Sequence, residues 1–328
     1  MTDATAGSAL PRSGGQPILR ILLTGGTGLI GRALCRHWQA QGHDLVVWSR
    51  TPERVARLCA GARGVATLRE LEGAPPFDAV INLAGAPIAD RPWTAQRRRV
   101  LWRSRVDLTR ELVEWLGRCE RPPRVLLSGS ATGWYGDRGQ EPLDEDSRSG
   151  KDDFGSQLCV AWETEAQRAE ALGMRVVLLR TAPVLATDGG MLPKLRLPFS
   201  MGLGGRLGSG RQWMPWVHLD DMVGLIDFLL HHVDCRGAFN ACAPDLVRNA
   251  DFASTLAATL RRPMLFSIPA WVLRMALGEM SVLLLGSQHL QPRRALEAGY
   301  RFRFPYLEEA LERLLETEAH LVTRRPAE

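Results

Sequence analysis

The sequence contains little lysine, little tyrosine and no closely paired cysteines. Among 328 residues with 41 basic side chains, only Lys151 and Lys194 are lysines, and there are three tyrosines. The six cysteines, at positions 35, 59, 119, 159, 235 and 242, include no Cys-x-x-Cys pair, which argues against a zinc site and against a disulfide framework. We expect no metal, free or buried thiols in a reducing compartment and, since no secretion signal is visible, a cytoplasmic location.

Long apolar runs are also missing. Residues 269–286 form the most apolar late segment, but Arg274 and Glu279 interrupt it before it reaches the roughly 20 residues that span a bilayer. The densest basic run, 97–105, belongs to a chain with a net charge of only +5 and is typical of a solvated helix face. Neither a membrane nor a nucleic acid is therefore expected as a partner. Residues 1–16, rich in small residues, are predicted to form a disordered leader.

From Ile18 onward, short apolar runs alternate with stretches of helical periodicity, which is typical of βαβ units. The pattern predicts an α/β protein with a Rossmann-like, doubly wound sheet of about six parallel strands in a first domain, 17–182. Residues 183–320 are predicted to form a smaller mixed α/β substrate domain, although the strand and helix near 218–242 are expected to pack back on the first domain. The predicted strands are 18–24, 44–48, 64–68, 78–83, 124–128 and 175–180, and the longer predicted helices are 94–118 and 154–172.

A glycine-rich turn ends the first strand and opens the first helix. The string TGGTGLIG (24–31) fits both Gly-x-Gly-x-x-Gly and Gly-x-x-Gly-x-x-Gly. Such glycines allow a tight turn, a close approach of the backbone to a pyrophosphate, and close packing of helix on strand. The helix N-terminus then offers free N–H groups to the phosphates. The predicted dinucleotide contacts in this turn are Gly25, Gly26, Thr27, Gly28, Leu29, Ile30 and Gly31.

The end of the second strand predicts which cofactor is bound. An NAD-binding protein places a carboxylate on the ribose hydroxyls there, whereas this chain has Ser49 and Arg50. A hydroxyl and a guanidinium suit a 2′-phosphate, so NADP(H) is predicted in preference to NAD(H); the alternative is that Arg50 is simply solvated. After the fourth strand, NLAGA (82–86) supplies small residues where the cofactor crosses, although Asn82 equally fits a strand-end cap. The further predicted contacts are Asn82, Leu83, Ala84, Gly85, Arg105 and Val184.

With these motifs the chain resembles the extended short-chain dehydrogenase/reductases, and more narrowly their atypical subgroup of epimerase family proteins. The resemblance rests on the strings TGGTGLIG, NLAGAPI, SRVDLTRELV, GWYGDRG, DDFGSQLCVAWE, GLGGRLGSGRQWMPWVHLDD and RRALEAGYRFRFP. It implies a Rossmann-like fold, NADP(H) binding, a small-molecule substrate that is unassigned across much of the subgroup, and a monomer or a homodimer.

The proton donor typical of that superfamily is missing. Its enzymes resemble one another in a Tyr-x-x-x-Lys pair, in which the lysine lowers the pKa of the tyrosine so that it exchanges a proton as hydride moves. The resemblance aligns Phe154 and Leu158 with these positions, and no Tyr-x-x-x-Lys occurs anywhere in the chain. Because phenylalanine donates no proton, we expect both residues to pack in the core.

Other residues are candidates for the missing role. Ser130 matches the serine position of the superfamily, and Tyr135 matches a tyrosine that often lines the substrate side in relatives. The alternative for Tyr135 is a purely structural aromatic in the pocket wall. Arg105 stands where many relatives have an active-site asparagine, so it either binds the cofactor or polarises a substrate oxygen.

Four residues of the C-terminal half are predicted to line or support a substrate pocket: Lys194, Trp213, Trp216 and His218. Lys194 either binds an acidic substrate or is merely exposed, and His218 is expected to be structural rather than a general base. The chain is therefore predicted to be an NADP(H)-dependent oxidoreductase or epimerase-like enzyme. The alternative is a non-catalytic NADPH-binding sensor or scaffold. A strict nucleotide-sugar epimerase is least favoured, because its chemistry needs residues that this chain lacks.

Overall fold

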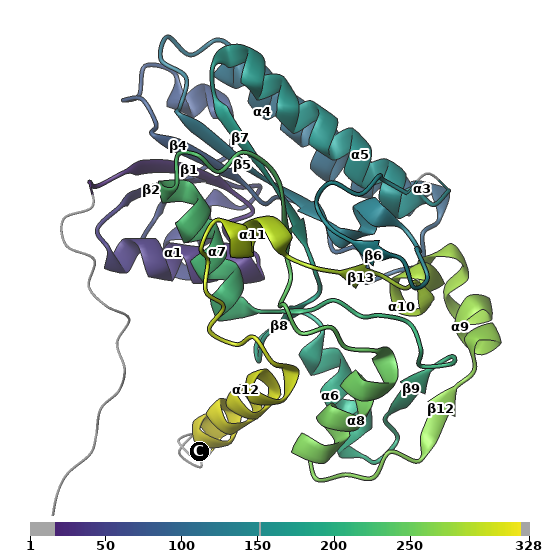
Figure 1. Ribbon diagram of the computed structural model, residues 1–328. Coiled ribbons are helices and arrows are strands. Elements are labelled where there is room, and N and C mark those ends of the chain that lie inside the picture. Colours follow the sequence, from purple (N-terminus) through teal and green to yellow (C-terminus); the bar gives the residue numbers. More distant parts are fainter. Residues whose placement is uncertain (1–16, 151, 323–328) are drawn as a thin grey trace, which may run out of the picture.

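Seven parallel strands form the central sheet (Figure 1). The computed structural model describes residues 17–150 and 152–322, with side chains up to residue 316; the predicted leader, 1–16, lies outside them. The strand order β11-β7-β5-β4-β1-β2-β3 is that of a doubly wound sheet, whose switch point for ligand binding lies between β1 and β4. The strands are β1 (Arg20–Thr24), β2 (Asp44–Trp48), β3 (Arg63–Val65), β4 (Ala79–Asn82), β5 (Val125–Ala131), β7 (Arg175–Thr181) and β11 (Gly237–Ala241).

Helices cover both faces of this sheet. Neighbouring residues of β1 point into different cores: Leu23 packs with one pair of helices, and Leu22 packs with another pair on the opposite face. Because both faces are covered, the strands are apolar on both sides, which is typical of a parallel sheet. The covering helices are α1 (Leu29–Ala40) and α7 (Leu219–His231) on one face, and α4 (Leu108–Leu116) and α5 (Phe154–Gln167) on the other.

Two features of the sheet and its helices differ from the sequence-based expectation. The sheet has seven strands rather than about six, because β11 pairs in parallel with β7 along its full length. The C-terminal half of the chain therefore supplies one edge of the sheet. The predicted helix 94–118 is also not uniform, since α3 (Ala95–Trp102) passes through a π-helical turn, Arg103–Asp107, before α4 begins.

Most of the remaining elements form a smaller unit, in the lower half of Figure 1, whereas α2 and α11 pack against the central sheet. The core of the smaller unit contains Phe252, Trp216 and Leu311 and joins α6, α8 and α12. No helix among residues 17–150 and 152–322 is long and apolar enough to cross a membrane. The other elements are α2 (Val55–Leu58), α6 (Leu192–Ser200), α8 (Asn249–Thr259), α9 (Ala270–Leu277), α10 (Val282–Leu285), α11 (Arg293–Glu297), α12 (Leu307–Val322), and the paired short strands β6 (Pro142–Leu143) with β13 (His289–Leu290), β8 (Val184–Leu185) with β10 (Val217–His218), and β9 (Gly205–Leu207) with β12 (Phe266–Ile268).

Candidate functional site

The glycine turn between β1 and α1 is packed too tightly for side chains at two positions. Gly25 has a φ of +72°, and a Cβ on it would lie 2.6 Å from the carbonyl carbon of Leu83. A Cβ on Gly31 would lie 2.3 Å from the carbonyl oxygen of Gly25. Both clashes involve backbone atoms, which cannot rotate away. These two glycines therefore bring β1, α1 and the chain after β4 into contact.

The N-terminus of α1 is open to an anion. Gly28 is its N-cap residue, no side chain caps the helix, and the first turn contains no acidic residue. The first N–H groups of a helix have no partner within the helix and carry partial positive charge. Gly28 is exposed and Thr27 is half-buried, so a ligand can reach this backbone. The turn therefore fits the pyrophosphate of a dinucleotide.

Ser49 and Arg50 follow β2 at the same edge of the sheet. β2 pairs in parallel with β1, and Thr24 lies opposite Trp48, so the carboxyl ends of the two strands are adjacent. The Ser49 Oγ accepts a hydrogen bond from the Thr51 N–H at 3.2 Å. Arg50 is exposed and forms no ion pair with any residue that the structure describes. An exposed guanidinium beside the glycine turn fits the 2′-phosphate of NADP(H).

The side chain of Asn82 has a structural role in the sheet. The side chain is fully buried. Its Oδ1 accepts a hydrogen bond from Thr24 Oγ1 at 2.7 Å, and its Nδ2 donates to Thr109 Oγ1 at 2.8 Å and to Ser128 Oγ at 3.1 Å. The amide group thus joins β1, β4, β5 and α4, both of its N–H donors are used, and its burial keeps the side chain away from a ligand. Of the two sequence-based interpretations, the strand-end role is the one that fits.

Arg105 lies over the accessible backbone after β4. Its Nη2 donates to the carbonyl of Ala86 at 2.9 Å, and a Cβ on Gly85 would lie 2.9 Å from its guanidinium carbon. The guanidinium also faces the ring of Trp162, 5.4 Å from the centroid. Burial lowers the pKa of Arg105 to about 10, so it remains a cation at neutral pH. It is presented by the π-helical turn, a feature frequent at functional sites, and it adjoins the predicted contacts Leu83 and Ala84.

Phe154 and Leu158 pack in an apolar cluster, as predicted. Phe154 is 9% exposed and contacts the ring of Trp93 edge to face, with centroids 5.4 Å apart. Leu158 is 1% exposed and shares this cluster with Trp162 and Met280. The start of α5, where the superfamily has its tyrosine and lysine, therefore supplies neither an acid nor a cation.

Ser130 belongs to a buried hydrogen-bond network on the C-terminal side of β5. Its Oγ donates to Glu163 Oε1 at 2.6 Å. Arg180 binds the same carboxylate through two hydrogen bonds, Nε to Oε1 at 2.9 Å and Nη2 to Oε2 at 3.0 Å. The Arg180 and Glu163 side chains are only 5% and 6% exposed. Such a bidentate pair fixes both side chains and leaves the Ser130 proton directed at Glu163.

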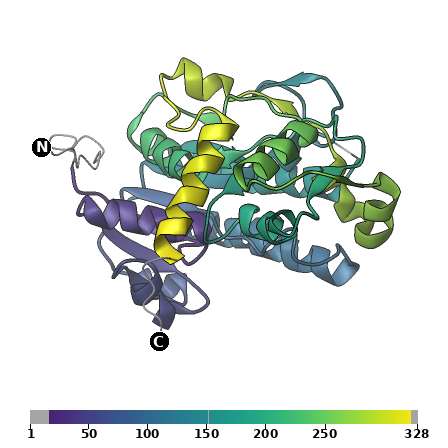
Figure 2. The ribbon, with the colours of Figure 1, turned by 90° about the horizontal axis from the view of Figure 1, so that it is seen from below.

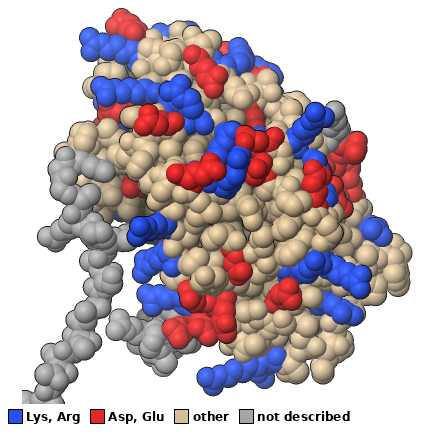
Figure 3. Space-filling view, viewed as in Figure 1, with Lys and Arg blue, Asp and Glu red and all other residues tan. Residues whose placement is uncertain are grey.

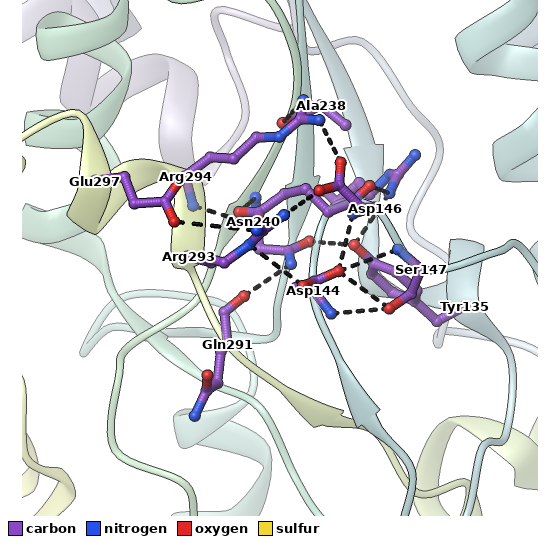
Figure 4. Close-up of polar contacts among 12 residues, drawn as sticks. Tyr135, Asp144, Asp146, Ser147, Ala238, Asn240, Gln291, Arg293, Arg294 and Glu297 are labelled. Atoms are coloured by element: carbon purple, nitrogen blue, oxygen red, sulfur yellow. Dashed lines mark hydrogen bonds and ion pairs between the residues drawn. The ribbon is translucent and has the colours of Figure 1, made fainter.

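Tyr135 lies at the other end of this network. Its hydroxyl accepts a hydrogen bond from Arg180 Nη1 at 3.0 Å and donates to Asn240 Oδ1 of β11 at 2.7 Å. Asn240 in turn donates to the carbonyl of Gln291 at 2.9 Å, and Figure 4 shows it between Tyr135 and Gln291. Burial raises the pKa of Tyr135 by more than its two hydrogen-bond partners lower it. A phenol in this state is a weak acid, so the arrangement fits the structural alternative better than the role of proton donor.

Glu163 and Arg180 were missed by the sequence reasoning. Arg180 did leave a signal, because it interrupts the apolar strand RVVLLRT and a charge in a buried strand needs a partner. No feature of the sequence indicated the role of Glu163, because glutamate is common on helices and its burial depends on how α5 packs. The partner of Arg180 could not be identified before the strand and the helix were placed together.

The predicted pocket residues Trp216 and His218 lie in the interior instead of lining a pocket. Trp216 is fully buried in the core of the smaller unit. His218 is 3% exposed, and its Nδ1 accepts the N–H of Asp220 at 3.0 Å, which caps α7. Burial lowers the pKa of His218 to about 4. Both side chains therefore support the fold, which agrees with the structural interpretation of His218.

The other two predicted pocket residues are more accessible and contact different neighbours. Trp213 is half-buried, stacks on His289 with centroids 4.4 Å apart, and faces the guanidinium of Arg248 at 4.5 Å. Lys194 is exposed, and its Nζ lies 3.2 Å from a carboxylate oxygen of Asp90.

A cavity of about 410 Å³ lies beside the start of α5. None of Lys194, Trp213, Trp216 and His218 is among its lining residues, which distinguishes it from the predicted pocket. Among the described residues there is no group of three or more side chains that could hold a metal ion. The cavity is lined by Tyr135, Gly136, Asp137, Arg138, Ser149, Gly150, Asp152, Asp153 and Val282.

Comparison with known proteins agrees with this geometry. Residues 21–242 match the NAD dependent epimerase/dehydratase family, and residues 268–314 match a domain of unknown function, DUF1731. The mouse epimerase family protein SDR39U1 is 36% identical, over 89% of this chain and 98% of its own length. Epimerase family protein YfhF of Bacillus subtilis is 34% identical, over 90% of this chain and 98% of its own length.

A solved structure extends the likeness to the whole fold. The crystal structure of human epimerase family protein SDR39U1 (isoform 2) with NADPH superposes with a TM-score of 0.82 at 34% identity, covering 91% of this chain and 99% of that one. The strand order of the sheet and the glycine turn after β1 agree with the family match over residues 21–242, and the second match covers residues 268–314. The chain therefore belongs to the NAD-dependent epimerase/dehydratase family, among the epimerase family proteins that carry a DUF1731 domain.

Proposed function

We propose that the protein binds NADP(H) and is an oxidoreductase or epimerase-like enzyme that works without a Tyr-x-x-x-Lys pair. The observation that carries this proposal is the uncapped N-terminus of α1, which lies beside the tight glycine turn and the exposed Arg50. NADPH in the structure of the human relative supports the choice of cofactor.

The nicotinamide cofactor would supply hydride transfer when bound. In the proposal, the backbone of residues 25–31 holds the pyrophosphate and Arg50 pairs with the 2′-phosphate. Arg105 binds the cofactor or stabilises negative charge on a substrate oxygen, since it is a fixed cation beside residues 83–85. Ordered water handles the proton, or Ser130 does so after its Oγ releases the hydrogen bond to Glu163, whereas the Tyr135 hydroxyl is held by two partners, Arg180 and Asn240. Val184, half-buried just after β7, remains a proposed cofactor contact.

The preference for NADP(H) predicts a selective effect of Arg50→Ala. Loss of a charge-assisted hydrogen bond to the 2′-phosphate is expected to weaken NADPH binding about 10- to 100-fold and to leave NADH binding nearly unchanged. Tryptophan fluorescence titration with both cofactors measures the two dissociation constants. Arg57→Ala, an exposed arginine of α2, is the matched control. Equal weakening of NADPH and NADH in Arg50→Ala would remove the 2′-phosphate assignment.

Tyr135→Phe tests the proton donor. The substitution removes a buried hydroxyl from Asn240 and Arg180, so we expect the free energy of unfolding to fall by about 1–3 kcal/mol. The rate of NADPH oxidation with a reactive carbonyl compound, normalised to folded protein, is expected to stay within a few-fold of wild type. A fall of about 100-fold or more in a folded variant would instead make Tyr135 the acid.

A non-catalytic NADPH sensor or scaffold is the second candidate. It is favoured by one observation, namely that the protons of both Ser130 and Tyr135 are donated inside the protein, to Glu163 and Asn240. Tight NADPH binding without turnover across a broad panel of carbonyl substrates would select this candidate. We also propose a cytoplasmic location, which the six free cysteines support.

A further inference from the structure

One exposed surface of the smaller unit is not used by the proposed cofactor site. It consists of Leu265, Phe266, Ile268, Trp271 and Met275, which we call the apolar edge. Leu265 is 76% exposed, Trp271 62% and Met275 79%. Figures 1 and 2 place α9 at the end of the molecule opposite α1, and in Figure 3 this end is mostly tan. Large apolar side chains this exposed, and next to one another, indicate a contact surface.

The apolar edge is formed by consecutive elements. Phe266 and Ile268 alternate along β12, so they project to the same side of that strand. On α9, Trp271 and Met275 are four positions apart and therefore share one helix face, whereas Leu273, 8% exposed, points inward. Two consecutive elements, β12 and α9, thus each present large apolar side chains to the outside.

Along the sequence, positively charged residues accompany the apolar edge. Residues 252–278 contain Arg261, Arg262 and Arg274 and no aspartate or glutamate. All three arginines are exposed, and none forms an ion pair with a described residue. The next acid, Glu279, already pairs with Arg98 and accepts the N–H of Phe154. The segment that carries the apolar edge is therefore also basic, with Arg274 on α9 itself and with Arg261 and Arg262 between α8 and β12.

We propose that the apolar edge docks on an anionic phospholipid surface. Protruding tryptophan, phenylalanine, leucine and methionine side chains enter the boundary between headgroups and acyl chains, while arginines attract the negative lipids. A second copy of the chain fits less well. A two-fold interface would place Arg274 of each copy near the same basic face of the other, and residues 252–278 contain no acid to pair with it. Arg274 and Glu279 interrupt residues 269–286, so this segment cannot span a bilayer, but its exposed apolar side chains suit it to lie on one.

Vesicle flotation with the full chain tests this proposal independently of the cofactor site. We expect binding to vesicles of phosphatidylcholine mixed with phosphatidylglycerol, weak binding to phosphatidylcholine alone, and loss of binding as salt rises. The double variant Trp271→Glu/Met275→Glu is expected to bind at least about tenfold more weakly, because two apolar side chains no longer enter the lipid boundary. Val233→Glu, at a site that is 71% exposed outside the apolar edge, is the control that should bind as wild type does.

The charges are tested separately. A variant with Arg261, Arg262 and Arg274 each replaced by glutamine keeps the apolar side chains and is expected to lose the preference for anionic vesicles. If Trp271→Glu/Met275→Glu fails to fold, as judged by circular dichroism, the glutamine variant still tests the proposal. Equal binding of both variants and wild type, or no binding of wild type to anionic vesicles, would overturn the proposal. So would a stable dimer in sedimentation equilibrium that Trp271→Glu/Met275→Glu abolishes, because it would assign the edge to a second copy.

Discussion

Replacing Glu163 by glutamine is expected to lower the free energy of unfolding by about 3–5 kcal/mol. The Glu163 carboxylate binds Arg180 through hydrogen bonds of 2.9 and 3.0 Å, and both side chains are buried. The substitution leaves a buried guanidinium without a counter-charge, which costs more than the intact pair contributes. Urea denaturation at neutral pH, followed by tryptophan fluorescence, measures the change.

Glu141→Gln is the matched control. Glu141 also binds an arginine, Arg138, at 2.6 Å, but its side chain is 50% exposed. Exposed pairs contribute little, so a cost below about 1 kcal/mol is expected. If the Glu163 and Glu141 variants were equally stable, burial of the Glu163–Arg180 pair would have no energetic role, and the network that holds Ser130 and Tyr135 would be weaker than its geometry indicates.

Replacing Gly31 by alanine is expected to weaken NADPH binding by at least about 100-fold, or about 2.7 kcal/mol. The new Cβ would lie 2.3 Å from the carbonyl oxygen of Gly25 and 2.6 Å from the Cα of Gly26. Because these are backbone atoms, α1 must move away from the turn, and the N–H groups that we propose bind the pyrophosphate move with it. Isothermal titration of NADPH into the folded variant measures the loss.

Gly117→Ala is the control for this substitution. Gly117 ends α4 with a φ of −66°, and the atom nearest to a Cβ at this position would be a side-chain carbon of Leu172 at 3.5 Å, an ordinary contact. Wild-type affinity is therefore expected. Retention of tight NADPH binding by Gly31→Ala would show that the cofactor does not depend on the glycine turn, and the proposed function would lose its main support.

The parts of the protein that local sequence determines were predictable. The glycine turn was predictable because glycines such as Gly25 and Gly31 are required sterically. The lack of a Tyr-x-x-x-Lys pair can be seen directly in the sequence. The burial of Phe154 and Leu158 followed from their helical spacing. The place of Arg50 followed from its position just after a strand, which puts it at the carboxyl edge of a parallel sheet.

The parts that depend on distant partners were not predictable. For Asn82, a cofactor ligand and a strand-end cap fitted equally well, because its hydrogen-bond partners, Thr24, Thr109 and Ser128, come from three other segments. For Tyr135, an acid and a structural aromatic both remained open for the same reason, since Arg180 and Asn240 lie on two other strands. The motif around Trp216 predicted that this side chain lines or supports a pocket. The packing of α6, α8 and α12 around it buries it instead in the core of the smaller unit.

The pairing of β11 with β7 has a consequence for how the chain is made on the ribosome. When Thr181 has been synthesised, β7 is complete but its outer edge has no neighbour, because β11 begins only at Gly237. An unpaired apolar strand edge is prone to intermolecular pairing. The nascent chain therefore grows by 55 residues (182 to 236) before the final strand of the sheet begins. Premature termination within these residues would release an aggregation-prone fragment.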